Sequence, residues 1–147
     1  MLDTPIPMDL PDDFPQSDGA APQTIAAKWQ GAVTQGSGFV AVPMALLRLQ
    51  SKYRLTATDM LVLINLLAHW WDPARTVFPR TTTIANRMGV DKRTVQRSTN
   101  KLMKSGLLLR QTLPDGKRSY AFDALASRLA RDVKIAYGIQ AQETHEG

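Results

Sequence analysis

The hydrophobic pattern is strongest in residues 57–71, where apolar side chains occur on every side of a helix. Thr56, with Asp59 three residues later, is a weaker form of the capping box and predicts where this helix begins. Asp72-Pro73 predicts where it ends, because the residue before a proline avoids the helical conformation. A helix that is apolar all round is buried in a core or against a partner, and we expect both for residues 57–71.

Shorter elements follow this helix. Thr76-Val77-Phe78 is a candidate strand, and apolar residues return at helical spacing from Thr81. A hairpin is expected over about 107–122, because the turn-forming run Leu113-Pro114-Asp115-Gly116 separates two strand-like segments. A last helix is expected over about 123–137. This order of elements predicts a mainly α fold with a small β-hairpin wing.

Residues 1–38 differ from the rest of the chain in composition. Five of the nine prolines lie in the first 22 positions, and residues 1–27 carry five aspartates and no basic residue. Such a segment buries too little apolar surface to offset its ordering entropy. We therefore expect an acidic, Pro-rich disordered tail at 1–38, with room for a short helical turn around Thr24–Trp29. A folded domain would follow at 39–122, and a helix with a short tail at 123–147.

Residues 81–100 have the spacing of two helices joined by a tight turn. Ala85 is the small residue where such helices cross, and Gly89 lies at the turn, where a left-handed backbone is easiest for glycine. Asp91 can cap the second helix with its side-chain oxygen, and Val95 is expected to be buried. These four requirements occur in register, which predicts a helix-turn-helix whose second helix spans about 91–105.

One side of this second helix is polar and basic. Helical geometry places five such residues on one stripe, Lys92, Arg93, Gln96, Arg97 and Asn100. Arginine can bind guanine through two parallel hydrogen bonds, and glutamine or asparagine can bind adenine in the same way. The surroundings are also basic, since residues 87–118 hold nine basic residues against two aspartates, and no glutamate precedes Glu143. The stripe therefore predicts a surface that reads base edges and is attracted to phosphates.

Several runs match a known pattern. They are Phe78-Pro79, Ile84-Ala85, Gly89 and Arg93-Thr94-Val95 with Arg97, flanked by residues 39–43 and 104–107. Over about residues 39–122 the chain resembles the winged helix-turn-helix domain of plasmid and phage replication initiators and bacterial transcriptional regulators. The resemblance implies this fold and double-stranded DNA binding, with the second motif helix in the major groove.

The predicted DNA contacts extend beyond the stripe. Thr82 lies in the first turn of the first motif helix, and three basic residues surround the wing, where they can reach phosphates or the minor groove. The complete predicted set is Thr82, Lys92, Arg93, Thr94, Gln96, Arg97, Asn100, Lys101, Lys104, Arg110, Lys117 and Arg118.

The sequence holds little other chemistry. The chain has no cysteine, which excludes disulfides, thiolate metal sites and cysteine nucleophiles. His69 and His145 are the two histidines and stand far apart, and no carboxylate pair has a suggestive spacing. We expect no enzymatic activity, no cofactor and no metal. We also expect a cytoplasmic protein without a membrane partner, because no apolar run could cross a bilayer and no signal peptide is visible.

The last helix suggests self-association. Leu125, Leu129 and Val133 form an apolar stripe that could cover the core of one subunit, but the helix at 57–71 needs covering too, so we favour a homodimer through both across a two-fold axis. Dimeric helix-turn-helix proteins place their reading helices about 34 Å apart on a palindromic site.

Three functions are compatible with these features. The first is a sequence-specific regulator of transcription. The second is a plasmid or phage replication initiation or partition accessory that binds origin repeats. The third is a winged-helix module that docks a protein, and it is disfavoured because such a module would not need Arg93, Arg97 and Lys101 together.

Overall fold

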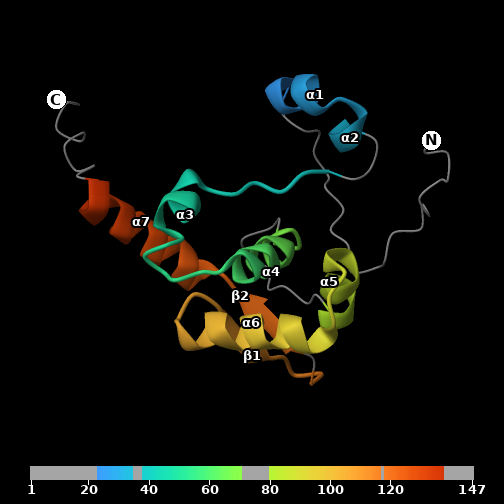
Figure 1. The fold of residues 1–147 in the computed structure, drawn as a ribbon, viewed down its shortest axis with the longest axis vertical. Coiled ribbons are helices and arrows are strands. Elements are labelled where there is room, and N and C mark those ends of the chain that lie inside the picture. The colour runs from blue at the N-terminus through green and yellow to red at the C-terminus, as the bar shows by residue number, and fades with distance from the viewer. Residues whose placement is uncertain (1–22, 35–37, 71–79, 117, 138–147) are drawn as a thin grey trace. The chain divides into compact units, whose positions relative to one another are not determined.

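The computed structural model describes residues 23–34, 38–70, 80–116 and 118–137 (Figure 1). Its contacts divide the chain into two units, Met1–Phe39 and Val40–Gly147. The first unit holds α1 (Gln23–Trp29) and α2 (Gly31–Thr34), neither of which buries a residue. Helix α1 corresponds to the short helical turn expected from the sequence.

The second unit contains five helices and a hairpin among its described residues. Helix α3 (Met44–Leu49) precedes α4 (Ala57–Leu67), which packs on both α5 (Thr81–Met88) and α6 (Lys92–Lys104). Strands β1 (Leu109–Thr112) and β2 (Arg118–Ala121) follow, and α7 (Asp123–Tyr137) packs against α3. The expected strand at 76–78 lies outside the described residues.

Helix α4 begins as expected but ends early. The Thr56 hydroxyl accepts from the Asp59 amide at 3.0 Å while the Asp59 carboxylate accepts from the Thr56 amide at 2.9 Å, a complete capping box. The predicted end near residue 71 is wrong, because the helix stops at Leu67. After Leu67 the backbone hydrogen bonds join residues three apart instead of four, and the Trp70 amide donates to the Leu67 carbonyl at 2.9 Å. The tightened turn places the Trp70 ring 5.2 Å from that of Phe122.

The helix-turn-helix forms as its spacing predicts. Gly89 ends α5 with a left-handed backbone at φ 70°, and Ala85 and Val95 are buried between the helices. The Asp91 carboxylate accepts from the Thr94 amide at 3.0 Å and caps α6. Local side-chain chemistry therefore sets both the turn and the start of α6.

The hairpin is shorter than expected. The strands pair antiparallel from Leu109 opposite Ala121 to Thr112 opposite Arg118. The predicted start of the first strand at Leu107 is wrong by two residues. Gly106, at φ 79°, ends α6 with a left-handed turn, and the Leu107 amide donates back to Leu102 at 3.0 Å. Leu107 therefore belongs to the turn that ends α6, and the strand begins only at Leu109.

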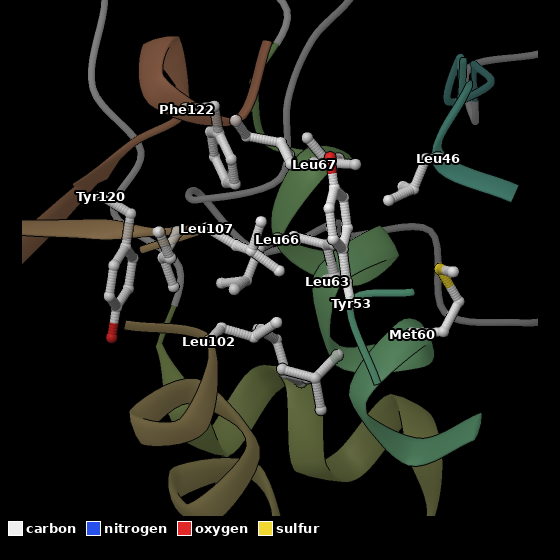
Figure 2. Close-up of a cluster of buried hydrophobic side chains, with 14 of the residues drawn as sticks. Leu46, Tyr53, Met60, Leu63, Leu66, Leu67, Leu102, Leu107, Tyr120 and Phe122 are labelled. Atoms are coloured by element: carbon white, nitrogen blue, oxygen red, sulfur yellow. The ribbon is translucent and has the colours of Figure 1, made fainter. Parts of the chain in front are cut away.

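The core lies where α4, α6, α7 and the base of the hairpin meet (Figure 2). Leu63 and Leu66 of α4 and Leu102 of α6 are at most 1% exposed, as are Leu107 and Phe122. The expectation that residues 57–71 supply a core is thereby confirmed for α4, since most of its apolar side chains enter this core.

Helix α7 supplies the same core. Leu125 is 3% exposed and Leu129 is 5% exposed, and Val133 packs against the cluster. Of the two arrangements considered for this stripe, cover within one subunit is the one found, since the chain buries it with its own residues. That argument for a homodimer is therefore removed, and the homodimer stays a prediction.

Candidate nucleic-acid interface

The two sides of α6 divide as the helical pattern predicts. Val95, Ser98, Thr99 and Leu102 are buried, and Met103 is half-buried. The opposite side exposes Lys92, Arg93, Gln96, Arg97, Asn100 and Lys104. No acidic residue occurs within α6, so its exposed side presents only cations and amides.

The N-terminal end of α6 is fixed by Asp91 and Thr94. The Asp91 carboxylate accepts from both the Thr94 hydroxyl, at 2.8 Å, and the Thr94 amide, at 3.0 Å. These two bonds lower the pKa of Asp91, helped by the nearby Arg97 and Arg93 guanidinium groups. The carboxylate therefore stays ionised at the positive end of the helix dipole. The Thr94 hydroxyl, a predicted DNA contact, is used in this cap.

Asp59 joins α4 to the middle of α6. Its carboxylate is 4% exposed and accepts from the Ser98 hydroxyl at 2.8 Å and from the Lys101 ammonium. Burial alone raises the pKa of Asp59, but the bonds from Lys101, Thr56 and Ser98 outweigh it and lower the pKa. Lys101 also donates to the Arg54 carbonyl at 3.0 Å. The Lys101 ammonium, a predicted DNA contact, is therefore bonded within the domain.

A second polar cluster holds the C-terminal end of α6. Arg128 of α7 donates to the Ser105 carbonyl at 2.6 Å, and its guanidinium lies 4.7 Å from the centre of the Tyr53 ring. The Tyr53 hydroxyl donates to Asp132 at 2.8 Å, and Arg131 donates to the same carboxylate at 3.0 Å. Both bonds lower the pKa of Asp132. Burial and the bond to Asp132 raise the pKa of Tyr53 to about 12.

The arrangement can bind an extended anion. Arg93, Gln96, Arg97 and Asn100 offer the donors and acceptors that suit base edges, one helical turn apart. Among the described residues, no group of three or more His, Cys, Asp or Glu side chains could hold a metal. No helix in the described part of the chain is long and apolar enough to cross a membrane.

Comparison with known proteins bears on this geometry. Residues 53–108 match the family model of a helix-turn-helix domain. The chain is similar to the solved N-terminal domain of DnaD protein from Geobacillus kaustophilus HTA426, at 18% identity and a TM-score of 0.56. The match covers 81% of this chain and 96% of that chain. The fold is a winged helix-turn-helix. At this identity the likeness shows the fold alone, and no curated protein matches the sequence.

In this winged helix-turn-helix, the predicted DNA contacts fall into three groups. Thr82, on the first turn of α5, Lys104, at the end of α6, and Arg110, on β1 opposite Tyr120, are exposed like the five residues of the stripe on α6. Thr94 and Lys101 are bonded within the domain. Lys117 and the side chain of Arg118 lie outside the described residues. Which of the twelve contact DNA stays a prediction.

Sequence reasoning missed the residues that orient α6. Tyr53, Ser98, Arg128 and Asp132 were not singled out, and Asp59 was assigned only to a cap. The contacts join residues 23 to 79 positions apart, from Arg128 with Ser105 to Tyr53 with Asp132. The one local signal was Asp132, a charged residue at the edge of an otherwise apolar stripe.

Proposed function

We propose that this protein binds double-stranded DNA in a sequence-specific manner, with α6 in the major groove. One observation carries the proposal, namely that the exposed side of α6 holds three basic and two amide side chains between Lys92 and Asn100 and no carboxylate. A surface helix without such a role would normally carry acidic side chains as well. Attraction to phosphates then supplies affinity, and base edges supply specificity.

The base-reading residues are Arg93, Gln96, Arg97 and Asn100. Their spacing of three to four residues keeps them on one face of α6, and each side chain suits one purine edge. Lys92 and Lys104 lie at the two ends of the same face, where a helix in the groove approaches the sugar-phosphate backbone. Thr82 and Arg110 add contacts from α5 and the wing.

A matched pair of substitutions tests the base-reading role. A duplex selected from a random pool is compared with versions altered one base pair at a time. Arg97→Ala should lower affinity for the selected duplex about 5- to 150-fold and relax the preference at one position. Lys104→Ala should weaken every duplex alike and make the salt slope less steep by about 0.9. Uniform losses from both substitutions would refute base reading by α6.

The cellular role that we propose is regulation of transcription, by occupying operator DNA. The alternative is a replication or partition accessory that binds origin repeats, and the resemblance of Phe78-Pro79 and Arg93-Thr94-Val95 to replication initiators favours keeping it. Chromatin capture distinguishes the two. Binding at many promoters supports a regulator, whereas binding at one repeat array supports the accessory role.

A further inference from the structure

The turn between α3 and α4 contains a strained arginine. Arg54 has a left-handed backbone, at φ 58°, although it is not glycine. The turn is closed by the Arg54 amide, which donates to Ser51 at 2.9 Å, and by the Leu55 amide, which donates to Gln50 at 3.0 Å. Side chains other than glycine adopt this conformation at a cost in free energy. Glycine would therefore make the same turn with less strain.

The side chain of Arg54 offers no compensation within the fold. It is exposed, and among the described residues no hydrogen bond or ion pair involves its guanidinium. Only its backbone carbonyl is used, as an acceptor for Lys101. Strained residues that the fold does not need are found mainly where a side chain has a function. The guanidinium of Arg54 is therefore a candidate contact for a ligand.

The surroundings of Arg54 indicate the charge of that ligand. Lys52 is exposed in the same turn, Lys104 lies one helical turn beyond Lys101 on α6, and Arg131 is exposed beside Asp132 on α7. Because Arg131 is paired with Asp132 at 3.0 Å, we call Lys52, Arg54 and Lys104 the turn surface. The side chains of two neighbouring aspartates, Asp59 and Asp132, are at most 7% exposed and are bonded inside the domain. The turn surface thus presents positive charge to solvent and no exposed carboxylate among these groups.

The turn surface extends the exposed side of α6, which carries the proposed base-reading residues, toward the C-terminal end of the helix. A helix of 13 residues is about 20 Å long, whereas the major groove is about 12 Å wide. When the residues near Arg93 and Arg97 reach bases, the last turn of α6 extends to the backbone at the edge of the groove. The bond from Lys101 to Arg54 holds the turn beside that part of the helix.

We propose that the turn surface, with Arg54 at its centre, binds phosphates that flank the groove occupied by α6, on the same DNA duplex. The inference rests on the proposed function and adds to it a second, sequence-independent contact surface, centred on the turn between α3 and α4. Each phosphate that it neutralises releases condensed counterions and so makes binding more salt-dependent.

Arg54→Gly tests the proposal, because it removes the charge and relieves the backbone strain together. The thermal midpoint should stay the same or rise. Affinity for the selected duplex and for unrelated duplexes should fall by the same factor. When salt is raised from 50 to 200 mM, the factor by which affinity falls should be about 3.5 times smaller for the variant than for the unmodified protein. This difference is the effect of one lost phosphate contact. Hydroxyl-radical footprinting should show protection lost at sugars beside the reading site.

Two controls separate the explanations. Lys28→Gln removes one positive charge from the other unit of the chain and should leave the salt slope unchanged. Arg54→Lys keeps the charge and should bind nearly as tightly as the unmodified protein. An Arg54→Gly variant with the original affinity, salt slope and footprint would overturn the proposal. A loss of affinity that depends on the identity of one base pair would also overturn it, as would a footprint change on a duplex other than the one that α6 occupies. If the unmodified protein binds no duplex, the proposed function itself fails.

Discussion

Asp59 is the residue through which α4 holds the reading helix, and replacing it by alanine measures that link. The carboxylate accepts from the Thr56 amide at 2.9 Å, from the Ser98 hydroxyl at 2.8 Å and from Lys101. Asp59→Ala removes all three bonds, and the bond from the Thr56 amide is one half of the capping box. Without the carboxylate, α6 is attached to α4 by apolar packing alone at this point.

The three losses are unequal. Loss of the bond from the Thr56 amide costs about 1 kcal/mol, and a buried Ser98 hydroxyl left without its charged acceptor costs about 2 kcal/mol. Lys101 contributes less, about 0.5 kcal/mol, because its side chain is 41% exposed and can turn to water. The free energy of unfolding should therefore fall by about 3–4 kcal/mol, which corresponds to a decrease in thermal midpoint of roughly 12–30 °C for a domain of this size.

Urea denaturation followed by circular dichroism provides the assay. Asn100→Ala, exposed on the same helix, is the control and should change stability by less than about 0.5 kcal/mol. Asp59→Asn keeps the shape and one of the two acceptor oxygens but not the charge, so its loss should lie between the two. A loss below about 1 kcal/mol for Asp59→Ala would refute the view that this carboxylate fixes α6.

The pH dependence gives an independent check on the same residue. The pKa of Asp59 is lower in the folded state than in the unfolded chain, where a carboxyl titrates near about 4. The stabilisation is therefore present above that pH and is lost as the pH falls through the lower, folded value. The profile of Asp59→Asn should be flatter below pH 4 than that of the unmodified protein. Parallel profiles would show that other carboxylates dominate acid unfolding.

Two further predictions concern the turn and the last helix. Gly89→Ala should cost about 1–2 kcal/mol for conformational reasons only, since no atom lies within 4 Å of the added Cβ at φ 70°, and Gly89→Asn should cost less in urea titrations. Leu129→Asp with Val133→Asp should unfold the domain rather than release a folded monomer, because Leu129 is 5% exposed in the core. Ile135→Asp, at a position 69% exposed on the same helix, is the control, and a folded double variant in near-UV circular dichroism would contradict the packing of α7 described above.

The sequence alone determined the helix-turn-helix and the exposed, polar side of its second helix. The Asp91 cap and the left-handed Gly89 act within a few residues of themselves, and the exposed stripe from Lys92 to Asn100 follows from helical periodicity. Interactions between neighbours in sequence leave a pattern in the sequence, which is why these elements could be predicted with their boundaries nearly correct.

The tertiary structure decided which partner each side chain meets. Lys101 belonged by spacing to the basic surface, but it pairs with Asp59, 42 residues away. Leu125 and Leu129 had the periodicity of an interface, but the same chain covers them. Helix α4 ended early where Trp70 reaches Phe122. Periodicity shows that a side chain will be buried or exposed, whereas its partner depends on packing between segments distant in sequence, which no local pattern records.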